Sequence, residues 1–246
     1  MRNAIWMAAG LLLLPALAAA QPQSQAETRL LRFPDIYKDS IAFVYGGDIW
    51  LADAKGGGAR RLTSDPGEEL APKFSPDGRW IAFTGEYGGN RQVYVISVDG
   101  GAPRQLTFHN DIGPLPPRGG YDNQVLGWTP DGKDVVFRTN RVAFSERNGR
   151  AYLVAAAGGM ERPMRMPEGG NGTFSPDGTK YAYTPLQSEF RGWKRHHGGR
   201  AQDIWIYDLK ADTARRITDY PGTDNQPMWV GARIYFTSDQ IGRAHV

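Results

Sequence analysis

The side chains that could do chemistry in this 246-residue chain fall into three groups: histidines, hydroxyls close to aspartates, and one basic segment. Cysteine is absent, which excludes disulfides, thiolate metal sites, iron–sulfur clusters and a cysteine nucleophile. The histidines are His109, His196, His197 and His245. Adjacent side chains on an extended strand point to opposite faces, and no acidic residue lies between Arg191 and Arg200. The histidine pair therefore does not predict a metal site.

A hydroxyl stands two residues before a carboxylate in three segments: Ser75-Pro76-Asp77-Gly78, Thr129-Pro130-Asp131-Gly132 and Ser175-Pro176-Asp177-Gly178. A serine nucleophile needs a base within hydrogen-bond reach and a third group that orients the base. Here the same segment instead recurs along the chain, and Pro, Asp and Gly are the residues that tight turns require. We interpret the segments as turns and predict no catalytic, cofactor-binding or metal-binding residue in this chain.

The basic segment runs from Leu186 to Gln202 and has Glu189 as its only acidic residue, so its local net charge is about +3. Trp and Arg are enriched at the centres of interfaces. We therefore predict contact with an acidic peptide terminus or an acidic partner surface, and a merely solvated loop remains the alternative. The candidate contact residues are Arg191, Trp193, Lys194, Arg195, His196, His197 and Arg200.

The elements that position these segments form a repeat. Short β-type triplets begin at Ile41, Ile81, Val135, Tyr181 and Ile234, at intervals of 40, 54, 46 and 53 residues. A second apolar strand follows each of the first four triplets, and a closing strand such as Arg61-Leu62-Thr63 ends three of the units. Four short strands in each such interval are typical of a propeller blade. A β-sandwich is the alternative, but the same turn recurs at the same place.

The predicted fold class is therefore all-β, an incomplete β-propeller of four-stranded antiparallel blades. We expect four blades and the first hairpin of a fifth, at about residues 30–63, 70–107, 124–167, 172–218 and 226–240. In the third unit Pro163-Met164-Arg165 replaces the closing pattern, which predicts a degenerate strand. A half-blade would leave an unpaired strand edge, so we expect the chain to be a fragment of a longer protein.

The strands of a blade alternate in direction, so its connections divide between two faces. Glycine pairs at Gly57-Gly58, Gly100-Gly101 and Gly158-Gly159 form the turns between the second apolar strand and the closing strand. These Gly-Gly turns and the Pro-Asp-Gly turns lie on one face, which we call the turn face. Connections from the second to the third strand, and from blade to blade, lie on the other, which we call the loop face. Both long insertions, residues 108–123 and the basic segment, are predicted to lie on the loop face. Surface loops also tolerate insertion without any function.

The two ends of the chain differ from the repeat. Residues 1–20 have a positive start, a short apolar run and three alanines, as in a cleaved signal peptide, and residues 21–29 form a linker. We expect an exported protein, periplasmic or extracellular, with no later membrane span; an uncleaved anchor is the alternative. Residues 241–246 do not continue the repeat and are predicted to be a non-native tail.

The overall charge says little about partners. The chain has 29 Lys plus Arg and 26 Asp plus Glu, a formal net charge of +3, which is weak evidence for nucleic-acid binding. We expect no nucleic acid and no cofactor. The partners that we expect are peptides or missing domains of the same chain, and homo-oligomerisation stays open.

The turn-and-triplet pattern resembles the blades of TolB and of many other exported propellers. A more specific set of segments resembles the first propeller of tricorn-type proteases, over nearly all of residues 30–239. These segments are Phe43–Trp50, Phe83–Tyr87, Leu126–Gly132, Trp193–Arg195, Gly198-Gly199, Ala201–Trp205 and Thr218–Asp224.

The resemblance implies a much longer parent with two propellers, a helical region, a PDZ domain and a serine-peptidase core. The family's catalytic Ser, His and Glu lie in those later regions, so no catalytic position carries over to this chain. The implied function is a propeller that restricts the access of peptides to a serine peptidase. A TolB-like protein-binding scaffold is the alternative. A weaker one is a prolyl-oligopeptidase-type enzyme, which would continue into an α/β-hydrolase domain.

Overall fold

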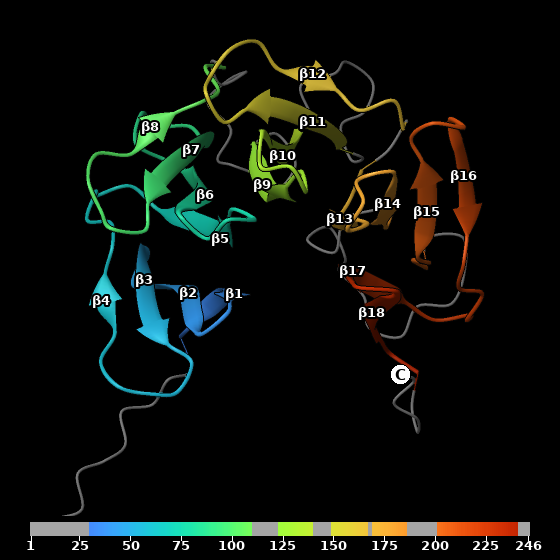
Figure 1. The fold of residues 1–246 in the computed structure, drawn as a ribbon, viewed down its shortest axis with the longest axis horizontal. Coiled ribbons are helices and arrows are strands. Elements are labelled where there is room, and N and C mark those ends of the chain that lie inside the picture. Colours follow the sequence, from blue (N-terminus) through green and yellow to red (C-terminus); the bar gives the residue numbers. More distant parts are fainter. Residues whose placement is uncertain (1–29, 110–122, 140–148, 167–168, 186–200, 241–246) are drawn as a thin grey trace, which may run out of the picture.

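The computed structural model describes residues 30–109, 123–139, 149–166, 169–185 and 201–240, and these ranges contain strands and turns without a helix. They accordingly include no helix that could span a membrane. The strands form four four-stranded antiparallel sheets and one two-stranded sheet, arranged side by side on an open arc (Figure 1). This confirms the predicted fold class. The signal-peptide and tail predictions concern residues outside the described ranges.

Each sheet follows chain order, with its first strand innermost on the arc and its last strand at the rim (Figure 1). The first blade consists of β1 (Arg32–Tyr37), β2 (Ser40–Tyr45), β3 (Asp48–Asp53) and β4 (Arg60–Arg61). The second consists of β5 (Glu69–Phe74), β6 (Trp80–Gly85), β7 (Gln92–Ser97) and β8 (Arg104–Gln105).

The third blade consists of β9 (Gln124–Trp128), β10 (Asp134–Thr139), β11 (Arg150–Ala155) and β12 (Arg162–Pro163). Its closing strand β12 is as long as β4 and β8, so the divergent sequence predicted to be degenerate still pairs with β11. The fourth blade consists of β13 (Gly172–Phe174), β14 (Lys180–Tyr183), β15 (Trp205–Asp208) and β16 (Thr213–Arg216). The hairpin of β17 (Asp224–Val230) and β18 (Arg233–Ser238) follows.

The Pro-Asp-Gly turns join the first two strands of blades two, three and four by the same hydrogen bonds. In blade two the Ser75 hydroxyl donates to Asp77 Oδ1 at 2.6 Å and accepts the Trp80 N–H at 3.0 Å. Thr129 and Ser175 make the equivalent pairs of bonds in the next two blades. These are the turn interactions that the repeated sequence predicts, and they occupy the hydroxyls in the structure of the turn.

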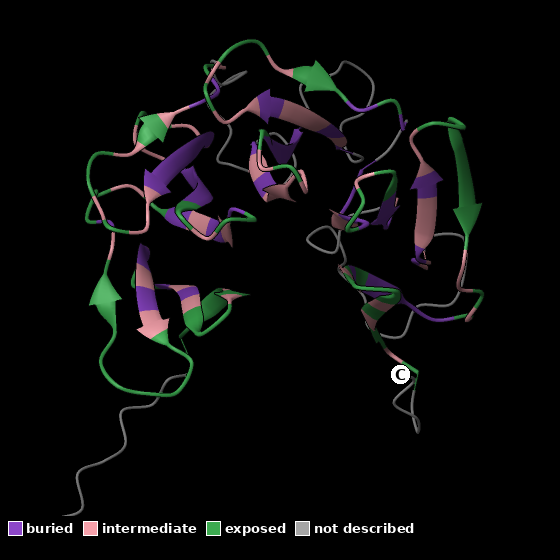
Figure 2. Ribbon diagram, viewed as in Figure 1, coloured by how far each residue is buried: buried purple, intermediate pink, exposed green. Residues whose placement is uncertain are grey.

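The hydrophobic core lies between blades rather than within one (Figure 2). Buried apolar side chains from one face of each sheet pack against the facing side of the next sheet, in three separate clusters. Burying a large apolar side chain contributes about 1.5–3 kcal/mol, so each blade is stabilised mainly by its neighbours. Large side chains that are at most 1% exposed include Ile49, Ile81 and Phe83 in the first cluster, Val135 and Phe137 in the second, and Met166 and Tyr181 in the third.

Candidate functional site: the axial channel and the loop face

The inner strands line a channel at the centre of the arc. Residues of β1, β5, β9, β13 and β17 surround a space of about 330 Å³ there. Its wall includes Asp35, Lys73, Gly127, Thr173 and Met228, one from each inner strand. A Cβ added at Gly127 would meet nothing within 4 Å, so this position leaves the channel open. The arrangement provides a passage that an extended polypeptide could enter.

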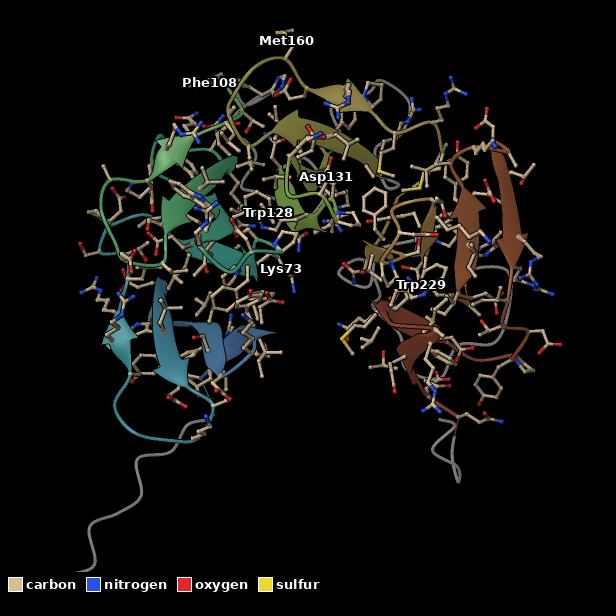
Figure 3. All side chains as sticks on the ribbon, viewed as in Figure 1. Lys73, Phe108, Trp128, Asp131, Met160 and Trp229 are labelled. Carbon is tan, nitrogen blue, oxygen red and sulfur yellow. The ribbon has the colours of Figure 1, made fainter. Side chains whose placement is uncertain are left out.

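Bonds between blades fix the channel wall. Lys73 Nζ lies 3.1 Å from Asp35 Oδ1, and the Phe74 N–H donates to the other Asp35 oxygen at 2.8 Å. The Trp128 indole N–H donates to the Lys73 carbonyl at 2.9 Å, and both side chains lie beside the open centre (Figure 3). The charges of Lys73 and Asp35 cancel, and the other residues of the wall are neutral, so the described part of the wall carries no net charge.

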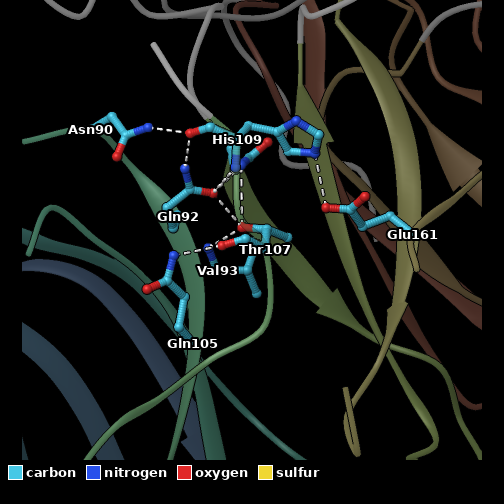
Figure 4. Close-up of polar contacts among 8 residues, drawn as sticks. Asn90, Gln92, Val93, Gln105, Thr107, His109 and Glu161 are labelled. Carbon is cyan, nitrogen blue, oxygen red and sulfur yellow. Dashed lines mark hydrogen bonds and ion pairs between the residues drawn. The ribbon is translucent and has the colours of Figure 1, made fainter. Parts of the chain in front are cut away.

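On the loop face, polar side chains join the second and third blades (Figure 4). The Thr107 hydroxyl accepts the Val93 N–H at 2.9 Å and donates to Gln92 Oε1 at 2.6 Å. Asn123, at the start of the next blade, donates to the same Gln92 oxygen at 2.8 Å. Thr107, Gln92 and Asn123 are buried, so these satisfied bonds hold the junction in one arrangement.

A second link crosses the same junction nearer the rim. His109 Nε2 lies 2.9 Å from Glu161 Oε1, so the residue after the second blade contacts the loop before β12 (Figure 4). The His109 carbonyl accepts bonds from the Asn90 and Gln92 amides. His109, for which the sequence predicted no role, thus forms a contact between blades.

At the equivalent junction of the first two blades the buried polar group is a carboxyl. Glu69 is fully buried, its N–H donates to the Gly47 carbonyl at 2.8 Å, and Oε2 accepts the Thr63 hydroxyl at 2.9 Å. Among the described residues no hydrogen bond reaches Oε1. Burial raises the pKa of Glu69 to about 7, since the Thr63 bond and the nearby Tyr87 hydroxyl only partly offset the desolvation. Two neighbouring carboxylates, Asp48 and Asp65, raise it further.

Sequence reasoning missed these junction residues, although a signal was present. Glu69, Asn123 and Asp224 occupy the same place, just before or at the start of an inner strand, and each is buried. The main chain links blades there as well: the Asp224 N–H donates to the Gln202 carbonyl at 2.8 Å, as Glu69 does to Gly47. Aligning the units on their inner strands, rather than on the Pro-Asp-Gly turns, would have revealed a recurring polar position.

The predicted contact residues Arg191, Trp193, Lys194, Arg195, His196, His197 and Arg200 lie outside the described residues. Thr184, two residues before the basic segment, and Gln202, its last residue, are buried on the loop face. In the ranges that the structure describes, no three His, Asp or Glu side chains are placed to hold a metal ion. The Ser75 and Ser175 hydroxyls bond to Asp77 and Asp177 and to the main chain of their own turns, so these bonds do not form a nucleophile–base pair.

Comparison with known proteins decides the family. Residues 28–246 match the model of the tricorn protease N-terminal beta propeller domain. The chain belongs to this family. It is 32% identical over 229 residues to tricorn protease homolog 1 of Streptomyces coelicolor, covering 92% of this chain and 20% of that protein.

The solved structures agree. The crystal structure of the tricorn protease superposes with a TM-score of 0.70 and 28% identity, over 84% of this chain and 20% of that one. A putative TolB from Agrobacterium tumefaciens superposes with a TM-score of 0.65 over 87% of this chain and 72% of that one, but its 18% identity shows the fold alone. The chain spans about a fifth of the length of the curated tricorn relatives it matches.

Proposed function

We propose that this propeller admits peptides to the active site of an exported tricorn-type serine peptidase, and that it does not itself catalyse hydrolysis. The axial channel carries the proposal. Each inner strand that the structure describes lines it, bonds between blades hold its wall, and its balanced charge does not select strongly for one sign of peptide. A peptidase whose chamber is reached through such a channel would cleave unfolded segments and exclude folded proteins.

The test narrows the channel in the full-length peptidase. Gly127→Trp places a large side chain where an added Cβ has free space, so the blade should still fold. We expect slower hydrolysis of peptides of ten or more residues and little change for tripeptides. Gly58→Trp is the matched control, because Gly58 also has free space for a Cβ but lies in the turn between β3 and β4. Unchanged hydrolysis of long peptides by Gly127→Trp would contradict gating.

Export rests on the N-terminal segment alone, since residues 1–20 have the composition of a signal peptide. The expected mature chain begins at Gln21. Fractionation of cells that express the protein, with N-terminal sequencing of the exported form, tests this. A protein that stays in the cytosol with Met1 intact would contradict it.

The TolB-like scaffold remains the other hypothesis for the same fold. It predicts capture of partner proteins without any peptidase in the parent chain. The tricorn hypothesis instead predicts that the parent gene continues into a PDZ domain and a serine-peptidase core, which one longer sequence read decides.

A further inference from the structure

A second open space lies on the turn face, between the second and third blades. It measures about 540 Å³, within the roughly 300–1,000 Å³ range of small-ligand sites. Trp80 and Pro76 of blade two line it, opposite Trp128 and Pro130 of blade three. Trp128 and Pro76 also line the axial channel, so this cleft lies directly beside the channel.

One residue explains why the cleft is open at this junction. The residue after each third strand donates its N–H to the carbonyl just after the Pro-Asp-Gly turn: Val98 to Arg79, Ala156 to Lys133, and Leu209 to Thr179. Val98 packs into the core between blades one and two, and Leu209 into the core between blades three and four. Between blades two and three the equivalent residue is Ala156, which lines the cleft.

Two tryptophans and two prolines form the apolar part of the cleft wall. The Trp128 ring is held in place because its N–H donates to the Lys73 carbonyl at 2.9 Å, whereas the Trp80 side chain is 41% exposed. Pro76 and Pro130 add two rigid rings, one from each of the neighbouring turns. An indole ring favours offset-stacked or edge-to-face contact with another aromatic ring, and the proline rings add apolar surface beside it.

The charged residues of the cleft indicate which group a ligand should carry beside its aromatic ring. The two carboxylates of the cleft, Asp77 and Asp131, are engaged by their own turns, with Arg79 Nε at 2.7 Å and Lys133 Nζ at 3.5 Å. Arg104 reaches across the cleft and donates to the Ala156 carbonyl at 2.6 Å. Among the residues that the structure describes, no carboxylate lies within 4.0 Å of its guanidinium. An anionic group therefore complements this end of the cleft.

We propose that the cleft binds a short free peptide with an aromatic side chain next to an acidic one. The aromatic ring stacks between Trp80 and the wall formed by Trp128 and Pro130, and the carboxylate pairs with Arg104. The site adjoins the axial channel, with which it shares Pro76 and Trp128, but all its residues belong to this chain, so it does not depend on the proposed peptidase.

Isothermal titration calorimetry of the 246-residue chain tests the proposal with three peptides. Ac-Ala-Asp-Phe-Ala-NH2 should bind, and either replacement of Asp by Asn or of Phe by Ala should weaken binding about tenfold. Arg104→Gln should remove the preference for Asp over Asn. If the Asp-Phe peptide does not bind, or binds no better than the other two, the proposal is wrong.

A pair of matched variants shows where the peptide binds. Ala156→Leu introduces the residue that the next blade has at the same position, so it should fold, fill the cleft and weaken binding at least about tenfold. Ala54→Leu makes the same change at the equivalent exposed position of the first blade and should not alter binding. If Ala156→Leu binds the peptide as tightly as Ala54→Leu does, the peptide binds elsewhere and the assignment is wrong. If Ala156→Leu does not fold, Arg104→Gln provides the same test.

Discussion

The buried carboxyl of Glu69 makes the junction between the first two blades sensitive to pH. Its pKa rises from 4.5 to about 7 on folding, mainly because burial penalises the charged form. Between these two values the folded chain keeps a proton that the unfolded chain loses. The contribution of the protonated Glu69 to the free energy of unfolding is therefore fully present below about pH 4.5. It falls as the pH rises toward 7 and stays low above that pH.

The magnitude follows from the size of the interval. At about 1.4 kcal/mol for each pH unit, the shift from 4.5 to about 7 lowers the free energy of unfolding by at most about 3 kcal/mol. Glu69→Gln keeps an acceptor for the Thr63 hydroxyl but cannot ionise. We expect its stability relative to the wild type to rise with pH, from no gain near pH 4.5 to about 3 kcal/mol at pH 8.

Urea unfolding of both chains at several pH values between 4.5 and 8 measures this difference. Glu68→Gln is the matched control, because Glu68 is the preceding residue but is 44% exposed in its ion pair with Arg91. That control should show no comparable rise with pH. A Glu69→Gln effect of constant size at every pH would refute the reasoning, since it would reflect packing rather than ionisation.

Three further predictions concern the turns, the rim and the basic segment. Gly78→Ala should destabilise the chain more than Gly132→Ala. Both residues have a positive φ, which alone costs about 1–2 kcal/mol, but only at Gly78 would the added Cβ clash with the Tyr37 ring. Equal melting temperatures of the two variants would contradict this. Arg162→Ala should lower the unfolding free energy by about 1–3 kcal/mol, because it leaves Asp134 unpaired at 12% exposure, and chemical denaturation measures the loss. In a full-length parent, replacing Trp193, Lys194 and Arg195 of the basic segment with alanine should weaken docking or peptide entry while leaving the fold intact. Unchanged activity, assembly and salt dependence would show that this segment is only a solvated surface loop.

The repeat was predictable from sequence because its turns are local. The bonds of Ser75 to Asp77 and Trp80 form within six residues, so the motif carries its own conformation from blade to blade. The junction residues could not be read in the same way. Whether Glu69 is exposed or buried depends on the neighbouring blade, which supplies Gly47 and Thr63.

The cleft beside the channel was hidden for a related reason. An alanine at position 156 is unremarkable in a strand-ending turn, and it matters only because Val98 and Leu209 fill the corresponding space in the neighbouring junctions. The cleft exists because a large side chain is missing at a contact between blades, and a missing side chain leaves no pattern in the local sequence.

Sharing the core between blades has a consequence for how the chain unfolds. The second and third sheets each contribute to two clusters, and the first and fourth sheets to one, so the arc behaves as a row of coupled units with nearest-neighbour interactions. Loss of order should begin at the ends of that row and travel inward. In native-state hydrogen exchange the amides of β17 and β18, whose hairpin has several exposed apolar side chains, should exchange well before those of β6 and β10, which lie between packed neighbours.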